Sequence, residues 1–144
     1  MFALVTVVAC APPPWDSQGI PADPDAEADP GPAITLLWPE VGAQVVGCTR
    51  MVAFVENFDL IPSTDPVSAN VQGQGHWHVY AGSSYSYCDE PYCVVELDPA
   101  YVAEGVQELR AALQQNDHSD VLDTAGAPVE ARVSVDVQQG ECTL

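Results

Sequence analysis

Residues 73–80 read Gly-Gln-Gly-His-Trp-His-Val-Tyr, and they predict a β-strand from which the rest of the fold can be worked out. Side chains alternate between the two faces of a strand, so His76 and His78 share one face while Trp77 and Val79 share the other. The apolar pair should face a core, which places both imidazoles on the outer face or at its rim. A His-x-His pair on a rigid strand lets two nitrogens converge on one point, as transition-metal sites require.

Short strands separated by turns account for most of the remaining sequence. The expected strands are 34–38, 45–58, 76–81, 94–97, 106–115 and 129–137. A long loop is expected at 59–75, a further loop at 83–92, and one helical turn ended by glycine at 98–105. No helix of useful length is expected. This pattern predicts an all-β protein, an immunoglobulin-like antiparallel β-sandwich of about seven strands.

The third histidine, His118, is expected to join the first two. In an immunoglobulin-like sandwich the strands at 76–81 and 106–115 would be antiparallel neighbours, so the start of one lies beside the end of the other. His118 follows the end of the second strand. The chain's only three histidines should therefore converge at one end of the sheet and could hold copper or zinc. Candidate additional ligands at the same end are Asn57, Asp117 and Asp120.

A resemblance supports this interpretation. The motif Gly-His-x-His-Val-Tyr from residue 75, the motif Leu-x-Ala-x-Leu-x-x-Asn-Asp-His-Ser from residue 109 and a valine-rich last strand resemble secreted bacterial immunoglobulin-like β-sandwich domains of unknown function. The resemblance covers roughly residues 34–137. It implies the fold and an exported location, and it implies no established activity.

The charge of the chain excludes one class of partner. Lysine is absent, and three arginines stand against 21 acids, for a net charge of −18. Such a surface repels phosphate, so we expect no binding to nucleic acid. The charge keeps an exported protein soluble, and it also raises the local concentration of cations.

The beginning of the chain predicts a membrane anchor. Residues 4–10 read Leu-Val-Thr-Val-Val-Ala-Cys and resemble the lipobox of bacterial lipoproteins, in which the cysteine, here Cys10, is acylated. Residues 1–10 would then be a signal segment. It is short and lacks basic residues, so we expect the true start upstream of Met1. Ala11 resembles the residue found in lipoproteins sent to the outer membrane. The alternative is a free, buried cysteine in an ordinary N-terminus.

Residues 11–33 contain seven prolines and five acids, which predicts a disordered tether ahead of a domain at 34–144. At roughly 3 Å per residue the tether would hold the domain several tens of Å from a membrane. The alternative is a disordered leader without a spacing role.

The other four cysteines, Cys48, Cys88, Cys93 and Cys142, predict two disulfides with three possible connectivities. A turn-like stretch between Cys88 and Cys93 favours a local bridge, which would leave Cys48 to pair with Cys142. The alternative is a four-cysteine zinc site, although the chain has no Cys-x-x-Cys spacing.

Two hypotheses about function remain. In the first, a lipid-anchored extracytoplasmic domain binds copper or zinc through His76, His78 and His118, as a carrier, scavenger or sensor. In the second, it is a non-enzymatic interaction or adhesion module of the bacterial cell envelope, and its histidines bond backbone carbonyls and stack on aromatic rings. We expect a monomer without catalytic activity, since no nucleophile-base pair and no phosphate-binding glycine loop occurs. The separation of the ring nitrogens distinguishes the two hypotheses.

Overall fold

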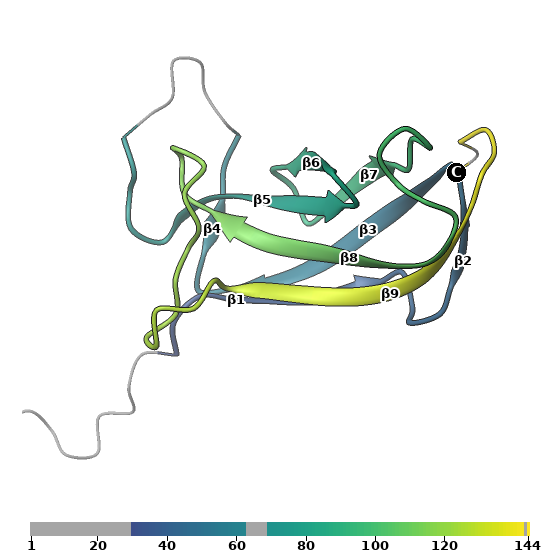
Figure 1. Cartoon of the computed structure of the whole chain (residues 1–144). Helices are drawn as coiled ribbons and strands as arrows, with labels where there is room; N and C mark the ends of the chain where they lie inside the picture. The colour runs from purple at the N-terminus through teal and green to yellow at the C-terminus, as the bar shows by residue number, and fades with distance from the viewer. Residues whose placement is uncertain (1–29, 63–68, 143) are drawn as a thin grey trace, which may run out of the picture.

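A computed structural model describes residues 30–62, 69–142 and 144, which form an all-β fold (Figure 1). They contain nine strands, where the sequence predicted about seven, and no helix long and apolar enough to cross a membrane. The predicted signal segment, Cys10 and the tether up to residue 29 lie outside the described residues. The strands are β1 (Ala33–Trp38), β2 (Gln44–Val46), β3 (Cys48–Glu56), β4 (Asp59–Leu60), β5 (Gln74–Ala81), β6 (Ser84–Cys88), β7 (Tyr92–Glu96), β8 (Gly105–Gln114) and β9 (Glu130–Gln138).

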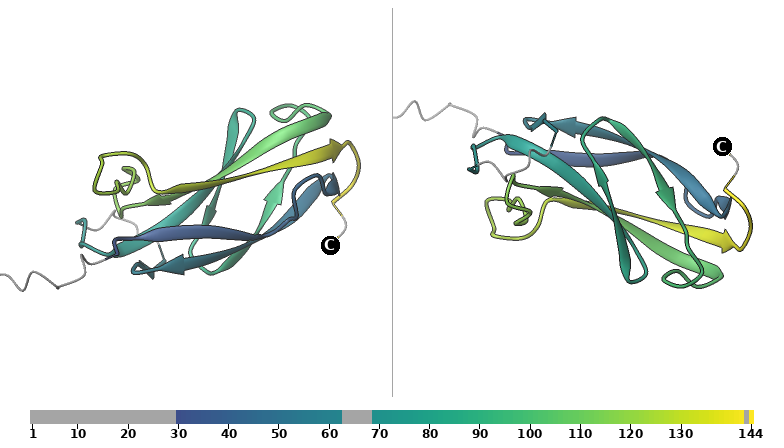
Figure 2. Two further views of the ribbon diagram at one scale, coloured as in Figure 1. Left: turned by 90° about the horizontal axis from the view of Figure 1, so that it is seen from below. Right: turned by 90° about the horizontal axis from the view of Figure 1, so that it is seen from above.

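The strands form two layers that pack face to face (Figure 2). One layer holds β1, β3 and β7, and the other holds β6, β5, β8 and β9, all in antiparallel pairs. β2 links the layers because it pairs with β3 and also, in parallel, with β9. β4 runs parallel to the start of β5. The fold is therefore the predicted immunoglobulin-like β-sandwich, with two short parallel pairs added.

The core lies between the layers and is built from alternate residues of each strand. Trp77 and Val79 of β5, Leu109 of β8 and Val135 of β9 are completely buried. The indole Nε1 of Trp77 donates a hydrogen bond to the backbone oxygen of Glu90 at 2.8 Å, which satisfies the one polar group of this large side chain. As predicted, the apolar residues of β5 face inward, which turns His76 and His78 the other way.

The long segment 45–58, whose inner face the sequence did not reveal, is divided at Gly47. This glycine has a φ of 65°, a conformation that most other residues avoid, and it separates β2 from β3. Within β3, Met51 and Ala53 are buried, whereas Arg50 and Phe54 are exposed. The side of β3 that carries Met51 and Ala53 is therefore the inner one.

Two segments predicted as loops contain strands. The loop expected at 59–75 includes β4 and the first residues of β5, and the loop expected at 83–92 includes β6. β6 alternates serine and tyrosine, so no aliphatic residue marks an inner face, and this is why its sequence resembled a loop. The turn expected at 98–105 is present as a single turn, in which the N–H of Val102 bonds the backbone oxygen of Asp98 at 2.9 Å.

Both disulfides have the connectivity that the sequence favoured. Cys88 and Cys93 join the end of β6 to β7, and Cys48 and Cys142 join the start of β3 to the C-terminal tail. These four cysteines therefore do not form a zinc site.

Candidate metal centre

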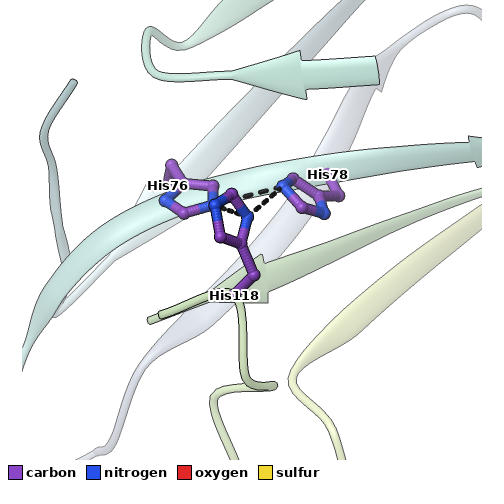
Figure 3. A group of neighbouring side chains, drawn as sticks. All are labelled: His76, His78 and His118. Atoms are coloured by element: carbon purple, nitrogen blue, oxygen red, sulfur yellow. Dashed lines mark hydrogen bonds between the residues drawn. The ribbon is translucent and has the colours of Figure 1, made fainter. Parts of the chain in front are cut away.

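The three histidines come together through the pairing of β5 with β8. The two strands are antiparallel, with His76 opposite Gln114 and His78 opposite Ala112. The beginning of β5 thus lies beside the end of β8, as predicted, and His118 follows shortly after that end. The ring of His118 lies over β5, beside the two rings of that strand (Figure 3). Among the described residues, this is the group of side chains whose ligand atoms could hold a metal ion.

The turn after β8 holds His118 in a conformation that few side chains adopt. The N–H of His118 bonds the oxygen of Gln115 at 3.0 Å, and the N–H of Gln115 bonds the oxygen of Ser119 at 2.8 Å. His118 has a φ of 64°, in the left-handed region that is uncommon outside glycine. Such a conformation persists only where the surrounding structure enforces it, and residues held in it cluster at functional sites.

Hydrogen bonds from both sides fix this turn. The carboxylate of Asp117 accepts from the N–H and the hydroxyl of Ser119, at 2.9 and 2.6 Å. The N–H of Asp117 donates to the side-chain oxygen of Asn70, and the amide of Asn116 donates to the backbone oxygen of Ala69, both at 3.0 Å. The turn that carries His118 is therefore attached to the segment that leads into β5, the strand that carries the other two histidines.

The ring nitrogens form a nearly equilateral triangle. His76 Nε2 lies 3.2 Å from His78 Nε2 and 3.3 Å from His118 Nδ1, and the last two atoms are 3.2 Å apart (Figure 3). A tetrahedral zinc ion with nitrogens at about 2.0–2.1 Å keeps them about 3.3–3.4 Å from one another. The triangle therefore fits three ligands of one ion.

Hydrogen bonding alone does not explain this triangle. A neutral imidazole nitrogen carries either a proton or a lone pair. One N–H among the three can point at one or both of the others, but the two remaining lone pairs then face each other and repel. A metal ion accepts all three lone pairs at once. Three ring nitrogens in mutual contact, two of them on buried rings, are therefore an arrangement that could hold a metal ion.

The structural interpretation of the histidines requires a ring nitrogen that bonds a backbone carbonyl, and within the described residues neither His76 Nδ1 nor His78 Nδ1 does so. His78 Nδ1 lies 3.4 Å from the hydroxyl of Tyr80, whose ring lies 4.0 Å from the guanidinium carbon of Arg110. His76 Nδ1 is buried and has no hydrogen-bond partner within the described part of the chain. In a zinc or copper complex through Nε2, each Nδ1 would carry the proton.

The two histidines of β5 are buried, which corrects the prediction of an exposed outer face. Their exposed fractions are 0% for His76 and 3% for His78. Tyr85 of β6 stacks on His78 with ring centroids 4.7 Å apart, and Tyr87 lies 4.6 Å from the ring of His76. β6 and the turn of His118 cover a face that the sequence pattern alone left open to solvent.

Burial keeps two of the imidazoles neutral. The pKa of His76 is lowered from 6.5 to about 4, chiefly by burial and in smaller part by the neighbouring His78 and His118. Burial likewise lowers the pKa of His78 to about 4, helped by His118 and opposed by the carboxylate of Asp120. Below neutral pH these two nitrogens therefore keep the lone pairs that a metal ion needs.

The three candidate additional ligands are engaged elsewhere. The amide of Asn57 donates to the backbone oxygens of Pro30 and Gly31 at 2.7 and 3.2 Å. Asp117 accepts from Ser119, as described above. Asp120 accepts a 2.6 Å hydrogen bond from the side chain of Gln114.

Tyr85 and Tyr87 pack on the imidazoles, and this role is one that the sequence reasoning did not assign to them. The sequence Tyr-Ser-Tyr shortly after β5 could have indicated this role. In a strand antiparallel to β5, alternate residues share a face, so both tyrosine rings lie on the same side. In the register of β5 and β6, Tyr87 lies opposite His78 and Tyr85 opposite Tyr80, on the histidine face.

Comparisons with known proteins add little to these observations. No protein-family model matches the chain, and no curated protein matches it. A solved structure of fibronectin(III)-like modules of Clostridium thermocellum CbhA is similar, with a TM-score of 0.44 and 18% sequence identity. The match covers 76% of this chain and 47% of that one.

Proposed function

We propose that this protein is an extracytoplasmic domain that binds one transition-metal ion, zinc or copper, through His76, His78 and His118. The observation that carries the proposal is the triangle of ring nitrogens, 3.2–3.3 Å apart, with two of the three rings buried. Imidazole nitrogens suit both metals. A structural group of histidines would instead direct its nitrogens at separate carbonyls.

The proposal includes export and a lipid anchor. Two disulfides are typical of proteins in oxidising compartments. The lipobox-like segment ending at Cys10 would attach the domain to the bacterial envelope, with the outer membrane as the proposed location. In that setting the domain would carry, scavenge or sense metal, and the acidic surface would raise the local concentration of cations.

One observation favours a second candidate, an interaction module of the envelope. Tyr85, with 59% of its surface exposed, and Tyr101 line a groove of about 450 Å³ together with Glu96. Exposed tyrosines beside polar groups are common at protein interfaces. This candidate predicts that Tyr101→Ala abolishes attachment to a partner, and it requires no metal.

Elemental analysis of the oxidised domain tests the proposed function. Zinc and copper are offered in turn, and free metal is removed by dialysis. We expect one bound ion per chain. Each of the changes His76→Ala, His78→Ala and His118→Ala should lower the affinity by more than about 100-fold, since even the loss of a residue that only supports a ligand costs 10–100-fold.

Non-specific binding to the acidic surface is the main risk in this experiment. Glu96→Gln, which removes an exposed carboxylate outside the cluster, serves as the matched control and should leave the affinity unchanged. Equal retention of metal by all four variants would contradict the proposed site.

A further inference from the structure

The ligand set of the histidine cluster has no negative charge. All three candidate ligands are imidazoles, which bind metals in the neutral form. A divalent ion held by them alone would keep its two positive charges. His76 and His78 are buried, and the rings of Tyr85 and Tyr87 lie against them. A double charge in such surroundings is costly unless an anion accompanies it.

The carboxylates of this region are held by other partners. Asp120 accepts from the side chain of Gln114, and Asp117 accepts from the N–H and the hydroxyl of Ser119. Neither carboxylate belongs to the group formed by the ligand atoms of the three histidines, which all lie within 4.8 Å of one another. Within the described residues, no carboxylate or thiolate therefore joins the three histidines.

The geometry leaves a coordination position open. An ion about 2.0–2.1 Å from three nitrogens that are 3.2–3.3 Å apart lies about 0.7–1 Å outside their plane. The three ligands then occupy three corners of a tetrahedron. Because His118 is exposed to solvent while the other two rings are buried, its side of the cluster is where a small ligand can enter.

We propose that the fourth ligand of a divalent ion in this cluster is an exchangeable small anion from solvent, of the carboxylate or halide class. This inference rests on the proposed function. An anion would offset one of the two charges of the ion without the loss of a proton, whereas bound water does so only after it ionises and a neutral ligand does not do so at all. When the anion leaves, the ion is held by three protein ligands alone and binds less tightly. Retention of the metal would therefore depend on the concentration of such anions in the surrounding medium.

Cobalt(II) in place of zinc gives the test, because the visible absorption of tetrahedral Co(II) changes with its ligands. The whole oxidised domain is loaded with Co(II), and azide as a halide analogue, acetate as a carboxylate and imidazole as a neutral ligand are added separately. We expect azide and acetate to shift the spectrum saturably and reversibly. The metal-free protein, with its net charge of −18, should not bind azide. Asp120→Asn should show the same starting spectrum and the same response as the unchanged protein.

Three other results would contradict the inference, and a fourth would contradict the proposed function. A shift with imidazole but with neither anion would show an open position that does not select for negative charge, and would overturn the inference. The absence of any shift would show that the chain itself fills the position, and would overturn it as well. A different starting spectrum in Asp120→Asn would identify that side chain as the fourth ligand and would overturn the inference. Failure of Co(II) and zinc to bind at all would contradict the proposed function itself.

Discussion

At the scale of single residues, burial of His76 and His78 links the stability of the metal-free protein to pH. Both pKa values are about 4 in the folded protein, against 6.5 for an ordinary histidine. As the pH falls from 6.5 towards 4, the unfolded chain takes up protons that the folded chain does not. The unfolded state is then favoured, so the free energy of unfolding decreases.

We expect this decrease to be about 1–2 kcal/mol for each of the two histidines between pH 7 and pH 5. Urea unfolding of the metal-free protein at the two pH values measures it. In His76→Gln the dependence on pH should be weaker. Equal free energies of unfolding at pH 7 and pH 5 in the unchanged protein would contradict the assignment of depressed pKa values.

Tyr85 offers a second test at this scale. Its ring stacks on His78 at 4.7 Å with an interplanar angle of 26°. Stacked pairs contribute about 0.5–1.5 kcal/mol beyond the area they bury. We expect Tyr85→Ala to lower the affinity for zinc by about 2- to 10-fold, because the ring of His78 is then less well held. Competition against a chelator measures this change.

Tyr101→Ala is the matched control, since Tyr101 is about as exposed as Tyr85 and makes no ring contact with a histidine among the contacts of the described residues. The affinity of this variant should be unchanged. If the two tyrosine variants bind zinc equally, the cover over His78 does not support the site.

At the scale of elements, the close approach of β5 to β8 depends on Gly75. A Cβ atom at this position would overlap the backbone oxygen of Gln114 and would approach Cζ of Phe58 at 2.9 Å. Gly75→Ala must therefore push β5 away from β8 immediately beside His76. We expect a loss of about 1–3 kcal/mol in stability together with weaker metal binding.

Thermal unfolding and a zinc titration measure the two effects. Gly31→Ala is the control, because no heavy atom lies within 4 Å of a Cβ at that glycine. Similar melting temperatures for the two variants would show that β5 and β8 tolerate a wider spacing.

The pairing of β5 with β8 was also the part of the fold that could be predicted from the sequence. Apolar and polar residues alternate in 76–81 and 106–115, which indicated the inner face of each strand. These two strands are antiparallel neighbours in an immunoglobulin-like fold, which placed His118 beside His76. The cover over the histidines could not be predicted in the same way. β6 is a short edge strand of tyrosine and serine, and only its register with β5 reveals that its rings lie on the imidazoles.

At the scale of the whole molecule, the two disulfides should differ in their effect on stability. Cys48 and Cys142 are separated by 94 residues, and Cys88 and Cys93 by five. A cross-link removes more conformational entropy from the unfolded chain when it closes a longer loop, which gives about 4–5 kcal/mol for the long one and about 2 kcal/mol for the short one.

Urea unfolding of the two double alanine variants, one for each disulfide, tests this expectation. Loss of the Cys48–Cys142 bridge should lower the free energy of unfolding by more than loss of the Cys88–Cys93 bridge. The opposite order would indicate that the short bridge stabilises the folded state through the position of β6 rather than through the entropy of the unfolded chain.

The hydrogen bonds from Asn57 to the oxygens of Pro30 and Gly31 have a practical consequence. They place the entry of the chain into the domain at the end where β5 begins and β8 finishes, while the C-terminus lies at the opposite end (Figure 1). A bulky fluorescent reporter or purification handle joined ahead of residue 30 would therefore lie at the end of the sandwich that carries the imidazoles. The same handle joined after residue 144 would leave them accessible, and it is the better choice for measuring metal uptake.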